Sequence, residues 1–329
     1  MADAHGQTTV ILDDGRKVQE LTLAAHGLSA KILTLGATLR DLRLEGHAPP
    51  LVLGYRDIQT YATNPGYLGA IVGRYANRIR GGRFDLDGHT VQLDQNDGDN
   101  HLHGGSDGCS SQIWQVEDHQ ADVLSLSLTL PDGHMGFPGA LHLQCQYTLL
   151  PNATLDIQIT GHSDKPTLCN LAPHSYFNLD GSAAIENQML QIPSQLYVPV
   201  GTAGIPLGHV ETAEEHMDFR TPRAANSTPL DVCFCFDADG TTLQRNATLN
   251  STTSGRSLEV WSNQPGLQVY NAPQMQTEDA GLLGAPYGPY CGIAFEPQIW
   301  PDAPNHPSFP SAVLRPGETY LNHSQVRFT

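Results

Sequence analysis

The chain has 329 residues, with 34 Asp or Glu against 17 Lys or Arg, and its formal net charge is −17. This excess of acid argues against nucleic acid as a partner, because polyanions are bound by clustered cations and lysine occurs only at Lys17, Lys31 and Lys165. No apolar run is long enough to cross a bilayer, and the six cysteines form no CxxC pair, so we expect no membrane association and reduced thiols.

The first residues, MADAHGQTTVILDDG, lack the basic start and the apolar stretch of a secretory signal, which indicates a cytoplasmic protein. A short helix is expected at 57–62. Apolar and polar residues then alternate at 124–130, 141–147 and 155–159, which is typical of half-buried antiparallel strands. Turn sequences such as Pro131-Asp132-Gly133 lie between them, without a βαβ rhythm. We therefore expect an all-β fold, a large antiparallel β-sandwich formed by a single domain over residues 1–329.

The segment GRYANRIRGGRF begins at residue 73, directly after an apolar run. It contains Asn77 and Arg78, and Arg74 stands four residues before Arg78. Amide and guanidinium groups are planar donors that suit hydroxyl or carboxylate oxygens. The alternative is a surface turn whose arginines are solvated.

Two histidines, His101 and His103, lie in NHLHGG at 100–105. Alternate residues of a strand project from one face, so this pair has the spacing of half a metal site. His174 and Glu296 could complete such a site, but no cysteine or acidic motif with metal spacing supports it. We expect no metal.

Other polar residues stand where strands begin or end. His174 opens HSYFNL, Asp231 opens an apolar run, and Gln268 and Tyr270 are expected to share one strand face. With Trp300 near, this mixture suits a sugar, because hydroxyls bind amides and carboxylates while a pyranose face stacks on aromatic rings.

Glu296 ends a short apolar run and is followed by prolines at 297, 301, 304, 307 and 310. Proline fixes φ and lacks a backbone donor, so we expect a strand that stops here and continues as a rigid, extended loop. A carboxylate at such a junction suits catalysis, and a solvated acid at a strand end is an equal alternative.

Six segments together make the chain similar to the aldose 1-epimerase (galactose mutarotase) family. They occur in the family's order: GRYANRI at 73–79, NHLHGG at 100–105, LPDGHMGFPG at 130–139, HSYFNL at 174–179, PGLQVY at 265–270 and FEPQIWPDAPNHPSFPS at 295–311. The resemblance covers nearly the whole chain. It implies a galactose mutarotase-like β-supersandwich and an isomerase that needs no cofactor.

The activity implied by this resemblance is interconversion of the α and β anomers of a free aldohexose, such as glucose or galactose. General acid and base groups would open and reclose the ring. Carried over by position, Glu296 matches the general base and His174 the general acid. The residues expected to bind the substrate are His103, Asn77, Arg78, Asp231 and Gln268. The expected partner is a small-molecule aldose, bound by a monomer or homodimer.

The chain also departs from the family pattern. Pro173 stands where the family usually has Asn, and Val232 where it usually has His. Two alternatives therefore remain: a hexose-6-phosphate 1-epimerase, which would need a cationic clamp, and a carbohydrate-binding or sensory β-sandwich without catalysis. The preferred sugar stays open.

Overall fold

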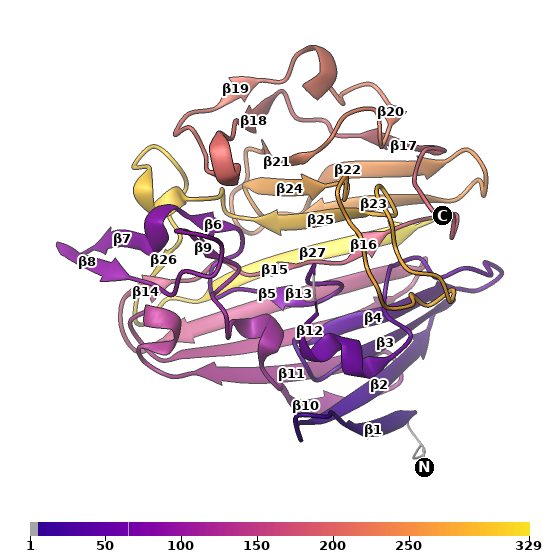
Figure 1. The fold of residues 1–329 in the computed structure, drawn as a ribbon, viewed down its shortest axis with the longest axis horizontal. Helices are drawn as coiled ribbons and strands as arrows, with labels where there is room; N and C mark the ends of the chain where they lie inside the picture. The colour runs from indigo at the N-terminus through magenta and orange to yellow at the C-terminus, as the bar shows by residue number, and fades with distance from the viewer. Residues whose placement is uncertain (1–5, 65) are drawn as a thin grey trace.

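The computed structural model describes residues 6–64 and 66–329, and it confirms the all-β fold (Figure 1). Three sheets of four or more strands account for most of the structure, and every strand pair in them is antiparallel. The helical segments of the described chain are short 3₁₀ segments of three to five residues. None of the helices in this part of the chain has the length and hydrophobicity needed to span a membrane.

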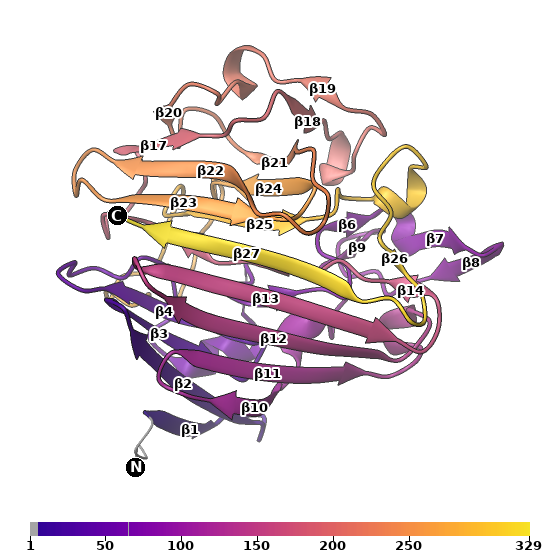
Figure 2. The same ribbon diagram turned by 180° about the vertical axis from the view of Figure 1, so that it is seen from behind.

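The largest sheet has nine strands and forms the broad surface that faces the viewer in Figure 2. In spatial order its strands are β10 (Gln115–His119), β11 (Val123–Leu130), β12 (Leu141–Leu150), β13 (Thr154–Ser163), β27 (Tyr320–Phe328), β23 (Ser257–Ser262), β22 (Gln244–Ser251), β17 (Gln188–Gln191) and β20 (Arg223–Ala224). The three alternating segments of the sequence lie in β11, β12 and β13, as predicted.

A six-stranded sheet carries the polar residues of the later motifs. Its strands, in order, are β16 (Tyr176–Phe177), β25 (Ile293–Gln298), β24 (Gly266–Tyr270), β21 (Asp231–Cys235), β18 (Leu196–Val198) and β19 (Glu211–Thr212). The N-terminal sheet has four strands: β1 (Gln7–Ile11), β2 (Lys17–Ala25), β3 (Leu28–Leu33) and β4 (Thr38–Leu44).

Smaller elements connect these sheets. Four two-stranded ladders join β14 (Thr167–Leu168) to β26 (Val313–Leu314), β15 (Ala172–Pro173) to β5 (Ile71–Val72), β6 (Arg78–Ile79) to β9 (His101–Leu102), and β7 (Arg83–Leu86) to β8 (His89–Gln92). The 3₁₀ turns are η1 (Ile58–Ala62), η2 (Arg80–Gly82), η3 (Cys109–Ser111), η4 (His134–Gly136), η5 (Thr202–Gly204), η6 (Glu215–Met217) and η7 (Ala303–Asn305). The expected helix at 57–62 is η1, which the Asp57 side chain caps by accepting from the Gln59 N–H.

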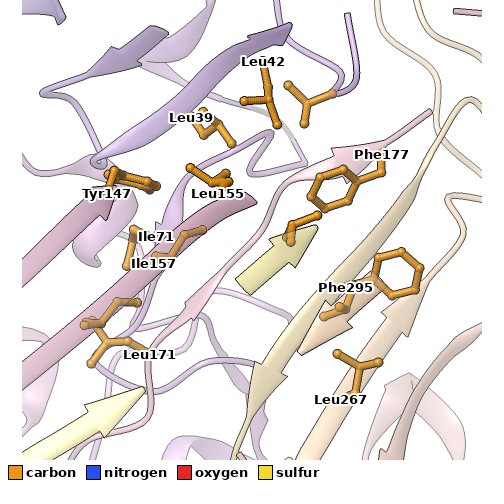
Figure 3. Packing of buried hydrophobic residues seen from close by; sticks show 14 of the residues in the cluster. Leu39, Leu42, Ile71, Tyr147, Leu155, Ile157, Leu171, Phe177, Leu267 and Phe295 are labelled. Atoms are coloured by element: carbon orange, nitrogen blue, oxygen red, sulfur yellow. The ribbon is translucent and has the colours of Figure 1, made fainter. Parts of the chain in front are cut away.

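One cluster of buried side chains joins the three large sheets (Figure 3). Tyr147 and Ile157 come from the nine-stranded sheet, Leu267 and Phe295 from the six-stranded sheet, and Leu42 from the N-terminal sheet. Burying a large apolar side chain contributes about 1.5–3 kcal/mol. The cluster therefore holds the six-stranded sheet firmly against its neighbours. All six cysteines are also buried and unpaired, in agreement with the expectation of reduced thiols.

The predicted end of the strand at Glu296 is wrong by two residues. Strand β25 continues through Pro297 to Gln298, and Glu296 lies inside it. Proline is accepted here because β16 pairs with β25 only at Ile293 and Ala294, so that only β24 faces Pro297. After β25 the strand gives way to a loop, as expected, but the loop is not the extended segment that the prolines predicted, because it turns at residues 301–302 and then forms η7.

Candidate active site

A cavity of about 710 Å³ opens at one face of the six-stranded sheet. Six of the seven predicted site residues line it: Asn77, Arg78, His103, His174, Asp231 and Glu296. They come from segments that are far apart in the sequence but meet beside β21, β24 and β25. The seventh, Gln268, is almost fully buried and does not line the cavity.

Glu296 reaches the cavity because strand residues alternate between two faces. Its neighbour Phe295 packs into the core cluster, while the Glu296 carboxyl points the other way and is only 2% exposed. One carboxyl oxygen, Oε1, lies 3.5 Å from Nε2 of His174, and the other, Oε2, has no hydrogen-bond partner. The alternative of a solvated acid is therefore wrong, and the free oxygen is available to a ligand.

His174 lies just before β16, whose ladder with β25 consists of Tyr176–Ala294 and Phe177–Ile293. The N–H of His174 donates to the Ala70 carbonyl and its carbonyl accepts from the Gly69 N–H, and in this position its ring reaches Glu296 at 3.5 Å. On the other side of β25, Gln268 is the direct partner of Glu296. Glu296 therefore lies between Gln268, its partner in the sheet, and the His174 ring.

The two residues that flank His174, Pro173 and Ser175, do not face the cavity. Pro173 belongs to β15, and both Pro173 and Ser175 face a small apolar space between the sheets. The His174 ring points the opposite way, into the cavity. Proline in place of the family's Asn thus alters the core side of this segment. Val232 borders the cavity, but its side chain belongs to the buried core cluster, so it offers no hydrogen-bonding group to a ligand there.

His103 follows β9 in a left-handed conformation, with φ of 52°. Its Nδ1 accepts a hydrogen bond from the backbone N–H of Asn77 at 3.1 Å. Since Nδ1 is the acceptor, the neutral ring carries its proton on Nε2. The ring centroid lies 5.3 Å from that of His174, so both imidazoles face the same space.

These groups also define the best place for a metal among the described residues. Ligand atoms of His103, His174 and Glu296 lie within 4.8 Å of one another. The tautomer of His103 does not fit this use, because a metal on Nε2 would require a proton on Nδ1, where the Asn77 N–H already points. His101 cannot help, since its ring packs on Phe137 and its Nδ1 bonds to the Asp94 carbonyl. The two histidines of the H-x-H pair therefore do not serve one site.

Arg78 is held between two carboxylates at the wall of the cavity. Its Nε donates to Asp97 at 2.7 Å, and its Nη1 lies 3.9 Å from Asp231. Asp231 in turn accepts from the Gln268 side chain at 2.6 Å. Backbone close to Gly204 covers the guanidinium, because a Cβ at that glycine would come within 2.9 Å of Nη1. The sequence reasoning missed Asp97, although a DGDN turn just before NHLHGG is a signal that could have found it.

Other predicted positions lie away from the cavity. Arg74 is buried elsewhere and donates to the carbonyls of Pro138 and Gly139, so it is neither a ligand residue nor a solvated turn residue. Trp300 donates to the Pro265 carbonyl and packs on Phe309, away from the cavity lining. The aromatic surface of the cavity consists instead of tyrosines, which the sequence reasoning did not select, apart from Tyr270: Tyr67, Tyr176, Tyr197 and Tyr270.

Burial controls the protonation of the central groups. It raises the pKa of Glu296 well above the usual value, and the Asp231 carboxylate raises it further, while Arg78 opposes both. Burial lowers the pKa of His174 to about 4 and holds the pKa of His103 well below its usual value. At a pH above the pKa of His174 and below that of Glu296, the two side chains together hold one proton. A pair that shares one proton can give it to one atom of a ligand while taking another from a second atom.

Known proteins resemble this chain along nearly its whole length. A family model described as Aldose 1-epimerase matches residues 19–327. The aldose 1-epimerase of Escherichia coli strain K12 is 33% identical, with 98% of each chain covered. The galactose mutarotase of Mus musculus is 35% identical over 96% of this chain and 95% of its own. Among solved structures, a galactose 1-epimerase from Lactobacillus acidophilus NCFM superposes with a TM-score of 0.85 at 29% identity, covering 98% of each chain. An aldose epimerase homologue from C. elegans gives a TM-score of 0.88 at 28% identity, covering 94% of this chain and 98% of its own.

Proposed function

The chain belongs to the aldose 1-epimerase family, and we propose that it interconverts the α and β anomers of a free aldohexose, such as glucose or galactose, in the cavity around Glu296 and His174. The observation that carries this proposal is the buried pair itself. A carboxyl and an imidazole stand 3.5 Å apart at the floor of a sugar-sized cavity, and each has an atom without a hydrogen-bond partner.

The reaction breaks the bond between C1 and the ring oxygen O5. Glu296 takes the proton of the C1 hydroxyl, the O–H electrons form the C1=O bond, and O5 leaves with a proton from His174. Rotation about C1–C2 then exposes the other face of the aldehyde. O5 attacks C1 again, returning its proton to His174, while Glu296 returns the first proton to O1. Each proton transfer contributes about 10²–10⁴-fold when the groups are well placed.

These roles require the sugar to move a proton within the pair. In the cavity without sugar, burial favours the uncharged forms, a protonated Glu296 and a neutral His174. The assigned roles need the reverse, a carboxylate and an imidazolium. The two arrangements differ by transfer of one proton across the 3.5 Å between Oε1 and Nε2. Sugar hydroxyls that donate to the Glu296 carboxylate would favour the charged arrangement.

The remaining site residues would hold the hydroxyl groups of the sugar. Nε2–H of His103 is a donor, because Nδ1 accepts from the backbone of Asn77. Arg78 supplies further donors, and the Asp231 carboxylate is an acceptor. Gln268 would not touch the sugar itself; its amide donates to Asp231 and so holds that carboxylate in place.

The cavity does not favour a sugar phosphate. Arg78 is the arginine that lines it, and two carboxylates already contact that guanidinium. The described residues that line the cavity include no lysine. A phosphate dianion would therefore face Asp231 and Glu296 without an unpaired cation. Nor does Pro173 support a binding protein without catalysis, because its side chain lies on the core side of the segment.

Polarimetry tests the proposal. Freshly dissolved α-D-glucose and α-D-galactose should reach equilibrium rotation faster with the wild-type protein than without it, and Glu296→Gln should remove the acceleration. Glu278→Gln, at an exposed position, is the matched control and should retain it. Equal acceleration by wild type and Glu296→Gln would show that the base is assigned wrongly.

We propose that residues 1–329 form one domain, which the core cluster shared by three sheets supports. A cytoplasmic location is supported by the six unpaired cysteines, since thiols stay reduced there. The protein would work as a monomer or homodimer, to be distinguished by sedimentation.

A further inference from the structure

We propose that Tyr67 is a positioning and specificity residue of this site: its ring fixes both cavity histidines and shields His174 from water, and its hydroxyl is free to bind the sugar. This inference rests on the proposed function. It assigns Tyr67 to the site from its geometry, since no motif singled it out.

The backbone of Tyr67 is the first observation. Its φ is 57°, in the left-handed region that aromatic residues rarely adopt, and glycines with positive φ lie one residue before and two residues after it. An aromatic side chain in this conformation is unfavourable unless its surroundings hold it. Such positions concentrate at ligand sites, where the strained residue presents its side chain in a fixed direction.

The surroundings do hold it, and they connect it to His174. The Tyr176 hydroxyl donates to the Gly66 carbonyl at 3.0 Å. The N–H of Gly69 donates to the His174 carbonyl at 3.0 Å, and the N–H of His174 donates to the Ala70 carbonyl at 2.9 Å. Gly69 is required at its position, because a Cβ there would come within 2.1 Å of a backbone oxygen. The segment carrying Tyr67 and the backbone of His174 therefore form one unit.

The ring of Tyr67 contacts both imidazoles. Its centroid lies 4.7 Å from that of His103 in a T-shaped arrangement and 5.9 Å from that of His174. The Tyr176 ring lies 5.1 Å from His174 as well. Two phenol rings and a second imidazole thus surround His174, and the Glu296 carboxyl completes its environment at 3.5 Å. Removal of the Tyr67 ring would open one side of His174 to water.

The hydroxyl of Tyr67 is the specificity element. Tyr67 lines the cavity, and its pKa is raised by burial and by the Asp97 carboxylate, while Arg78 opposes this rise. Arg78, which is paired with Asp97, lines the same cavity. A sugar held by Arg78 would find a further donor and acceptor in this hydroxyl.

The test separates the ring from the hydroxyl. Tyr67→Phe keeps the ring, so NMR titration of the His174 imidazole should be unchanged, while KM should rise about 5- to 10-fold for the lost hydrogen bond. Tyr67→Leu removes the ring, so kcat should fall about 10- to 100-fold through misplaced histidines. Water then reaches His174, whose low pKa results from burial, and its titration should move to higher pH.

Two further variants make the result decisive. Tyr67→Asn also removes the ring but tolerates the left-handed backbone, so it reports the same effects if the leucine variant does not fold. Tyr197→Leu changes another cavity tyrosine and should leave the His174 titration as in wild type. Tyr67→Leu or Tyr67→Asn with wild-type kcat and His174 titration would overturn the proposal. The titration is read without sugar, so it tests Tyr67 independently of whether the wild type accelerates mutarotation.

Discussion

Replacing Glu296 with Gln should stabilise the folded protein at neutral pH, although it removes the proposed base. The carboxyl is 2% exposed and one of its oxygens has no partner, so its ionised form is poorly solvated. Gln has nearly the same shape and does not ionise. The gain in the free energy of unfolding is therefore expected to depend on pH, and that dependence is the test.

The sign and slope follow from linkage. The unfolded carboxyl titrates at its ordinary pKa of 4.5, whereas burial and then Asp231 raise the pKa of Glu296 in the folded state. Well below pH 4.5 the carboxyl is protonated in both the folded and the unfolded state, so its ionisation does not reduce the free energy of unfolding. As pH rises toward the folded pKa, the unfolded chain loses a proton that the folded chain keeps. The wild type then loses stability relative to Glu296→Gln by about 1.4 kcal/mol per pH unit.

Urea titrations at intervals of about one pH unit, followed by intrinsic fluorescence, measure this difference. The advantage of Glu296→Gln should be constant at low pH, grow through the acidic range and level off above the folded pKa. Glu278→Gln, at an exposed position, should show no growth. A difference between Glu296→Gln and wild type that stays constant from pH 4.5 to neutrality would refute the reasoning, because it would mean that folding leaves the pKa of this carboxyl unchanged.

Three other outcomes are expected. Asp97→Asn frees the Nε side of Arg78 and should lower kcat/KM for a hexose about 10-fold, whereas Asp99→Asn should not. Prolonged treatment with a chelator should leave the mutarotation rate unchanged, since the tautomer of His103 does not suit a metal; a loss restored by zinc would contradict this. The pH profile of kcat/KM should decline toward pH 4, where the pair binds a second proton because burial lowers the pKa of His174 to about 4, and again at alkaline pH, above the raised pKa of Glu296, where the pair loses its one proton; an acid-side decline near 6.5 would contradict this.

The long strands were predictable, and the short ones were not. Half-buried strands such as β12 alternate between core and solvent along ten residues, so the sequence displays their period. Strands β5, β6 and β9 have two residues each, too few for any period. They form because neighbouring segments meet in the folded chain. The prolines after Glu296 correctly indicated a loop but wrongly an extended one, and they placed its start too early, since β25 has only one partner strand at Pro297.

The sequence indicates which residues belong to the site, but not how their side chains are arranged in space. Glu296, His174 and His103 line one cavity as expected, but nothing in the sequence indicates that the His174 ring comes within 3.5 Å of the Glu296 carboxyl. Cross-strand register depends on pairing between distant segments, which one sequence does not display. Trp300 was misplaced because indole rings serve packing as readily as sugar binding, and here the ring packs on Phe309.

The register between β16 and β25 has a consequence for how this enzyme folds. Strands shift only by whole residues, and a shift of one residue turns every side chain to the opposite face. A β25 strand that has slipped by one residue would therefore turn the Glu296 carboxyl away from the cavity that His174 lines. Partly folded chains that lack this ladder should be inactive even when the nine-stranded sheet has formed. Recovery of polarimetric activity during refolding would then report the formation of this register together with the rest of the cavity.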